Sequence, residues 1–230
     1  MDPESSHATL GSYQLAFGSE RLTLLPERAV WLEQHRALLV ADIHFGKETV
    51  FRRHGIAVPD GSSTADLERL SQLCVSVGAA DLWILGDLVH GALSETLRSM
   101  LQDWLATLAP VRVHLVEGNH ERHAQGPLRS LLLDHHSEAR LGPYRLRHEP
   151  ASRSSAATTA APEIVGHSHP VARLTIARHR ALRIPAFAMS EHRLTIPAFG
   201  QFTGGHRVDI NSSLQCYGIL GNRVFPVPAS

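Results

Sequence analysis

The fold of this chain follows from one stretch, Ala37-Leu38-Leu39-Val40-Ala41-Asp42-Ile43-His44, in which an apolar run ends in Asp42 and His44. A short apolar run of this kind is typical of a buried strand. The polar side chains come where such a strand would leave its sheet. We therefore expect them to be held as ligands at the sheet edge.

Three later motifs repeat this arrangement, each after an apolar run: Gly86-Asp87, Gly118-Asn119-His120-Glu121 and Gly166-His167-Ser168-His169. A fourth predicted strand, Tyr144-Arg145-Leu146-Arg147, leads directly to His148. The carboxyl ends of parallel strands gather at one edge of a sheet, so these side chains are expected to form one site.

The segments between the first three predicted strands have helical periodicity. Apolar residues recur on one face from Ser62 or Ser63 to Val77, with a serine cap at the start and Gly78 at the end. A second stripe runs from Leu97 to Leu108, before Pro110. Strands that alternate with helices predict right-handed crossovers and a parallel sheet.

The remaining segments complete the expected fold. Residues 13–32 are predicted to form a hairpin or meander, residues 128–136 a further helix, and residues 151–162 a flexible loop. The segments 194–205 and 217–227 are predicted to be rich in β-structure. The fold class is therefore α/β (α+β), with two mixed β-sheets flanked by helices in one domain over residues 1–230.

Composition restricts the class of protein. The chain has 230 residues, no apolar run long enough to cross a membrane, and a polar start that lacks a secretory signal, so a cytoplasmic location is expected. Two cysteines are too few for a disulfide framework. The formal net charge of +0 gives no basic surface by composition alone, and Lys47 is the only lysine. Sixteen histidines, by contrast, favour metal binding.

Seven candidate metal ligands lie at the predicted strand ends: Asp42, His44, Asp87, Asn119, His148, His167 and His169. Two divalent ions that share one carboxylate would use them all. Mixed carboxylate, amide and imidazole ligands suit Mn²⁺, Fe²⁺ or Zn²⁺ better than Ca²⁺. His148 has a second interpretation, because a histidine before Glu149-Pro150 can simply cap a turn.

Such a centre is suited to attack on phosphorus by a bridging hydroxide. His120 follows the candidate ligand Asn119 and is expected to face the substrate, where it would protonate the leaving oxygen or hydrogen-bond the phosphate. His90 and His123 could line the same cleft, although positions on the surface or behind the ligands explain them as well. For His135 and His136, a favourable contact with the end of the predicted helix is sufficient explanation.

In their order, the four motifs resemble those of the calcineurin-like metallophosphoesterase superfamily, Asp-x-His, Gly-Asp, Gly-Asn-His-Asp/Glu and Gly-His-x-His. The resemblance implies a four-layer αββα sandwich. It also implies that one ion is held by Asp42, His44, Asp87 and His169, and the other by Asp87, Asn119, His148 and His167. It makes His120 the catalytic histidine.

Further blocks resemble the bacterial ligase-associated metallophosphoesterases, which are described as DNA damage response endonucleases: residues 24–29, 41–47, 51–53, 146–150 and 196–205. This resemblance implies a manganese-dependent phosphodiesterase that nicks single-stranded DNA in DNA repair. It also implies a homodimer and a functional link to a DNA ligase and a helicase. The Ala/Ser/Thr-rich stretch 151–162 departs from the family pattern. This difference bears on how a substrate reaches the site and not on metal binding.

Two other functions stay open from the residues alone. A phosphatase or pyrophosphatase acting on a small or lipid-linked substrate would need the same centre. A non-catalytic scaffold could keep the fold, but it would be expected to lack some of the ligands, and none is missing here.

Overall fold

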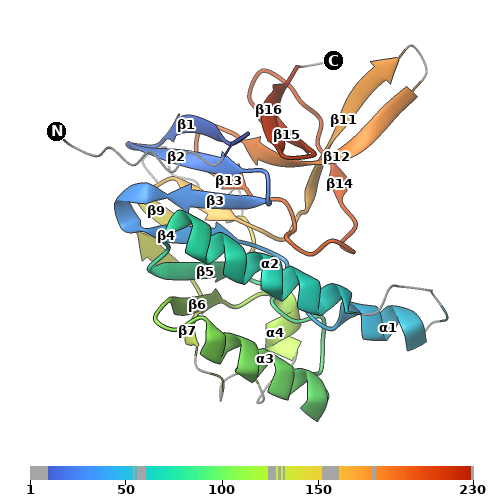
Figure 1. Cartoon of the computed structure of the whole chain (residues 1–230). Coiled ribbons are helices and arrows are strands. Elements are labelled where there is room, and N and C mark those ends of the chain that lie inside the picture. The colour runs from blue at the N-terminus through green and yellow to red at the C-terminus, as the bar shows by residue number, and fades with distance from the viewer. Residues whose placement is uncertain are drawn as a thin grey trace.

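The computed structural model of the protein describes residues 10–53, 55, 61–123, 128, 131, 133–151, 161–177 and 180–228. Two mixed β-sheets pack face to face, and helices lie against the first of them (Figure 1). The predicted α/β sandwich of two mixed sheets is confirmed.

The first sheet has seven strands in the order in which they occur along the chain. Its first four strands are antiparallel and its last four are parallel. The meander predicted for residues 13–32 and the parallel strands after it are both confirmed. The strands are β1 (Tyr13–Phe17), β2 (Glu20–Leu25), β3 (Ala29–Leu32), β4 (Ala37–Val40), β5 (Asp81–Leu85), β6 (Arg112–Val116) and β7 (Asp134–His136).

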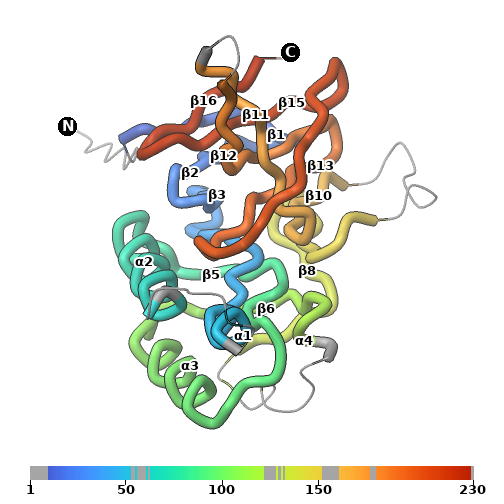
Figure 2. The backbone as a smooth tube through the Cα atoms, turned by 90° about the vertical axis from the view of Figure 1, so that its right-hand side faces the viewer, coloured from blue at the N-terminus to red at the C-terminus, as the bar shows by residue number. Residues whose placement is uncertain are grey.

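The second sheet has nine strands and contains the C-terminal half of the chain (Figure 2). Its main path runs β14-β11-β12-β13-β10-β9-β8, and β15 and β16 extend it from β12. The strands are β8 (Ala139–Leu141), β9 (Tyr144–Arg147), β10 (Glu163–Val165), β11 (Pro170–Ala177), β12 (Arg180–Met189), β13 (Arg193–Thr195), β14 (His206–Arg207), β15 (Gln215–Leu220) and β16 (Arg223–Val227).

The helices described all come from the first 123 residues: η1 (Glu33–His35), α1 (Lys47–Arg53), α2 (Ser62–Val77), α3 (Glu95–Thr107) and α4 (Asn119–His123). The two long predicted helices are confirmed as α2 and α3. The cap of α2 is not the expected serine, because Gly61 is the N-cap and makes no side-chain hydrogen bond. In α3 the Ser94 hydroxyl accepts a hydrogen bond from the amide of Leu97.

The two faces of β4 explain how the layers are held together. Leu38 and Val40 pack in one core with apolar residues of α2 and α3, whereas Ala37 and Leu39 pack in a second core with residues of the second sheet. Alternate residues of a strand point to opposite faces, so one apolar run can serve both cores. This is why the predicted strands are apolar throughout.

The prediction of a helix over residues 128–136 is wrong at the C-terminal end of that range. Asp134–His136 form β7, which pairs in parallel with β6, so His135 and His136 lie in a strand and not at a helix terminus. The edge of β6 offers backbone hydrogen bonds, and these outweigh the local helical pattern. Residues 152–160 of the expected 151–162 loop lie outside the described residues.

Among the helices described, none combines the length and the apolar character needed to cross a membrane.

Candidate metal centre

Six of the seven predicted ligands lie close together where strands of both sheets end: Asp42, His44, Asp87, His148, His167 and His169. The first sheet supplies Asp42 and His44 after β4, Asp87 after β5, and Asn119 at the start of α4 after β6. The second sheet supplies His148 after β9 and two histidines after β10, His167 and His169. The site therefore lies at the junction of the two sheets.

One group of side chains contains Asp42, His44 and His169, whose ligand atoms all lie within 4.8 Å of one another. His169 Nε2 is 3.2 Å from Asp42 Oδ1 and 3.5 Å from His44 Nε2. Two nitrogen ligands about 2.1 Å from the same ion would be separated by roughly this distance. The three side chains can therefore hold one cation.

A second group contains Asp42, Asp87 and His148. Asp87 Oδ2 lies between the groups, 3.6 Å from His148 Nε2 and 4.0 Å from His44 Nε2. His167 joins this side, because its Nδ1 is 3.1 Å from His148 Nε2. Asp87 is thus placed to face two cations at once.

The hydrogen bonds of two histidines determine which ring nitrogen faces the site. His148 Nδ1 lies 3.0 Å from the carbonyl oxygen of Leu85, and His169 Nδ1 lies 3.2 Å from that of Gly204. A carbonyl oxygen only accepts, so in both rings Nδ1 carries the proton. In a neutral ring the lone pair is then on Nε2, which faces the carboxylates, as in a metal-ligating histidine.

The donor atoms fit divalent cations. Asp42 is fully buried, and its Oδ1 accepts no hydrogen bond although His169 Nε2 is close. A buried carboxylate oxygen that faces imidazole lone pairs is unfavourable without positive charge between them. Burial also lowers the pKa of His44 to about 2, so this ring is neutral and able to act as a ligand.

The backbone is strained at most of these residues. Asp42, His44, Asp87, His167 and His169 all have positive φ values, between 43° and 67°. Residues other than glycine rarely adopt this conformation, and it persists only where the surrounding structure imposes it. Such strain is concentrated at functional sites, and here it aims side chains from separate loops at one point.

Two motif glycines leave room for the ligands. A Cβ atom at Gly86 would overlap the ring of His148, and one at Gly118 would overlap the carboxylate of Asp87. Gly86 therefore allows the end of β9 in the second sheet to approach the loop after β5, and Gly118 allows the loops after β5 and β6 of the first sheet to approach each other.

Glu121 organises the first-sheet half of the site, a role that the motif did not reveal. Its buried carboxylate accepts hydrogen bonds from the amides of Asp87 and Gly118, both at 2.8 Å, and of Val89 at 3.1 Å. It thus joins the loop after β5 to the loop after β6. Burial raises the pKa of this carboxyl.

We expect Glu121→Gln to loosen these loops, because an amide nitrogen would replace one acceptor and face backbone N–H groups. The free energy of unfolding should fall by about 1–3 kcal/mol, and metal affinity should fall with it. Denaturant unfolding and metal titration measure the two effects. Glu95→Gln on the exposed start of α3 is the control and should change neither. Unchanged stability and affinity in Glu121→Gln would contradict this role.

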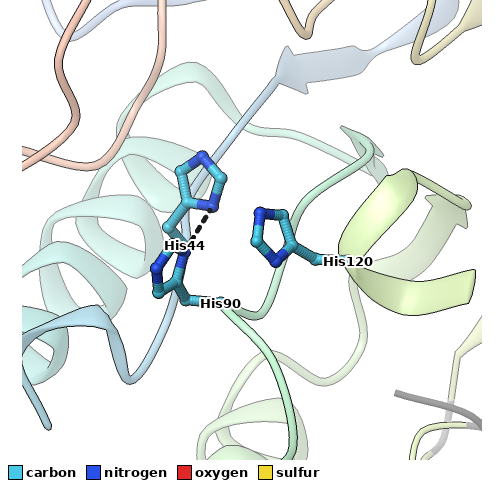
Figure 3. A group of neighbouring side chains, drawn as sticks. All are labelled: His44, His90 and His120. Carbon is cyan, nitrogen blue, oxygen red and sulfur yellow. Dashed lines mark hydrogen bonds between the residues drawn. The ribbon is translucent and has the colours of Figure 1, made fainter. Parts of the chain in front are cut away.

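His120 lies beside the ligands and presents its ring to the site (Figure 3). Its backbone amide donates to Asp87 Oδ1 at 3.1 Å, and its Nε2 is 3.9 Å from Asp87 Oδ2. Its side chain is 35% exposed, far more than that of His44 or Asp87. This position suits a group that contacts a substrate.

His90, whose place the sequence left open, is brought into the same cluster. Its Nδ1 is 3.4 Å from His44 Nδ1, and its ring centre is 4.7 Å from that of His120 (Figure 3). Burial lowers the pKa of His90 to about 4. The bridge that aligns Phe45 with Val89 brings these rings together, and the local sequence gives no sign of that pairing.

Lys47 stands at the edge of the site, at the start of α1. Burial lowers the pKa of its ammonium group, and the charges of Asp42 and Asp87 oppose that shift. Its Nζ lies 5.8 Å from the ring centre of Phe51. The charge of the only lysine of the chain thus interacts with both candidate metal-binding carboxylates.

Comparison with known proteins identifies one family and two similar structures. The calcineurin-like phosphoesterase family model matches residues 35–171. The crystal structure of Pseudomonas putida nuclease MPE has 33% sequence identity and a TM-score of 0.78, and the match covers 94% of this chain and 100% of that chain. The phosphoesterase Yfce from E. coli has 17% identity and a TM-score of 0.42, with coverage of 82% and 95%. No match was found among curated proteins.

Proposed function

This chain belongs to the calcineurin-like phosphoesterase family, and on that premise we propose that it hydrolyses phosphodiester bonds of single-stranded DNA with two Mn²⁺ ions. Family membership makes it a metal-dependent hydrolase. We choose nucleic acid as the substrate because the chain is similar to a nuclease over nearly its whole length. We further propose that it acts in DNA repair together with a ligase and a helicase, and that it forms a homodimer.

We assign the side chains to the two ions as the family resemblance implies. Asp42, His44, Asp87 and His169 would hold one ion, and Asp87, Asn119, His148 and His167 the other. When bound, such ions lower the pKa of water and neutralise charge on phosphoryl oxygens. Asp87 Oδ2 lies between the imidazoles of both sets, which supports its role as the shared ligand.

His120 would then act on the substrate. Its exposed ring can donate a proton to the oxygen that leaves the phosphorus, or a hydrogen bond to a phosphate oxygen. The hydrogen bond from its backbone amide to Asp87 holds the His120 backbone beside the centre. Its neighbour Asn119, the first residue of α4, would supply an amide oxygen to the centre.

The test compares substrates in parallel. Protein loaded with Mn²⁺ is incubated with circular single-stranded DNA, with duplex DNA, with bis-p-nitrophenyl phosphate and with p-nitrophenyl phosphate. We expect the circular strand to be opened and the diester to be hydrolysed, and chelation of the metal to stop both reactions. Activity confined to the monoester would contradict the proposal and favour a phosphatase. Sedimentation of the same sample tests the expected homodimer.

A further inference from the structure

Three neighbouring strands of the second sheet place arginine side chains on one face: Arg173 on β11, Arg183 on β12 and Arg207 on β14. Arg173 lies directly opposite Arg183 in the antiparallel pair of β11 and β12. Arg207 pairs with Val171 in the parallel pair of β14 and β11, and Val171 points to the same face as Arg173. We call these three residues the arginine face.

The arginine face surrounds an open pocket, which Val171 and Ala181 also line. The other side of the hairpin is occupied, because Ala172 and Ile184 pack in a small core with residues of β15 and β16. The pocket side is left to solvent, and all three arginines are exposed. β11 and β12 form the long hairpin that extends from the body of the molecule (Figure 1).

The positive charge of this face is poorly compensated within the described residues. Arg173 makes no ion pair with any of them. Arg183 donates to the carbonyl oxygen of Gly205 at 2.6 Å, and Arg207 Nε lies 3.8 Å from Asp209 Oδ1, in an exposed pair that contributes little. Like charges directly opposite on two strands are destabilising. An anion bound between Arg173 and Arg183 would remove that cost.

The arginine face is joined to the metal centre by short connections. β11 begins at Pro170, directly after His169. The loop before β14 accepts a hydrogen bond from His169 at Gly204 and one from Arg183 at Gly205. At about 3.3 Å per residue, Arg173 lies roughly 13 Å along the strand from His169, a distance that a few nucleotides span.

We propose that the arginine face binds backbone phosphates of a nucleic-acid strand next to the phosphodiester held at the metal centre; this rests on the proposed function. Guanidinium groups suit phosphate, since each can donate two hydrogen bonds to it. A small phosphoester at the metal centre could not reach these residues. The arginine face therefore distinguishes a polymer substrate from a small one.

The test uses the double variant Arg173→Gln/Arg183→Gln in the full chain. Its affinity for a fluorescent single-stranded oligonucleotide, from anisotropy, should fall about 10- to 30-fold at 0.1 M salt, because each lost phosphate contact lowers the salt-dependence slope by about 0.7. The KM for cleavage of that strand should rise similarly. Hydrolysis of bis-p-nitrophenyl phosphate should not change, and the melting temperature should not fall, because the substitutions remove the repulsion between Arg173 and Arg183.

Two control variants make the result specific. Arg21→Gln removes an exposed arginine of β2 in the other sheet and should leave affinity and slope as in the wild type. Arg173→Lys/Arg183→Lys keeps the charges and should restore most of the slope.

The experiment separates failure of this inference from failure of the proposed function. If the wild type cleaves the strand and the glutamine variant binds and cleaves it equally well, the arginine face has no such role, although the proposed function stands. If the variant loses activity on the strand and on the small diester to the same extent, the effect is structural and the inference is wrong. If the wild type hydrolyses the small diester but neither binds nor cleaves the strand, the proposed function and this inference fall together.

Discussion

Replacing Asp87 by asparagine is expected to lower turnover by about 10³-fold or more, with loss of metal from the protein. Asp87 Oδ2 lies between imidazoles of both candidate metal sets, so a neutral amide weakens both sites in one substitution. The stabilisation of phosphoryl charge by the centre is then lost together with the activation of water. Metal analysis after manganese loading and the rate of diester hydrolysis measure the two effects.

The same variant should be no less stable than the wild type without metal. Asp42 and Asp87 are both buried and close, so their charges disfavour the folded state when no cation is bound. Asparagine removes one charge and keeps the side-chain oxygen that accepts from the amide of His120. Metal at 100 times its Kd should stabilise the wild type by about 2.7 kcal/mol, and the variant by much less.

Asp103→Asn is the matched control for this prediction, because Asp103 is an exposed carboxylate on α3 away from the site. It should keep the wild-type rate and metal content. Full metal content and turnover in Asp87→Asn would show that Asp87 is not a shared ligand.

Replacing His120 by alanine is expected to slow cleavage of DNA by about 10²- to 10⁴-fold, the usual contribution of a general acid. The amide that donates to Asp87 remains in the variant, so the metal centre should keep its content of ions. Hydrolysis of bis-p-nitrophenyl phosphate should fall much less, because p-nitrophenolate leaves without a proton. Parallel assays of the two substrates at saturating Mn²⁺ measure this difference.

A structural effect of the His120 substitution would give a different pattern. Loss of bound metal would contradict both roles proposed for His120, whereas an equal loss of rate on both substrates would exclude the general acid and leave the hydrogen bond to the phosphate. Asn119→Ala gives the contrast, since loss of a candidate ligand should reduce both rates and the metal content while the melting temperature of the metal-free protein stays close to that of the wild type.

Much of the fold could be predicted because β4, β5 and β6 are buried on both faces. Their apolar runs therefore stand out, and the polar residues that follow mark one edge of a parallel sheet. The site residues that follow these strands could be placed together for the same reason, whereas His148, His167 and His169 reach the site from the second sheet and not from the single sheet edge that the sequence predicted. Their individual roles as ligands stay predictions, because the sequence gives their approximate location and not their partners.

The features that the sequence did not reveal depend on contacts between distant segments. Glu121 acts on backbone amides of two loops, so no spacing of side chains discloses it. His90 reaches the site through the alignment of Phe45 with Val89. β7 carries a local pattern that also fits a helix, and only its pairing with β6 decides between the two.

Reagents that modify lysine side chains would modify this protein at one position, Lys47. Because no other residue of the chain is a lysine, an acylating or reductive-alkylating reagent meets a single side-chain amine, and the charges of Asp42 and Asp87 act on that amine. A dye attached there would report on the loading of the centre from within a few residues of it. Because the label would lie so close to the centre, it would also change metal binding there. A reporter that leaves the enzyme intact therefore has to be attached to another residue type.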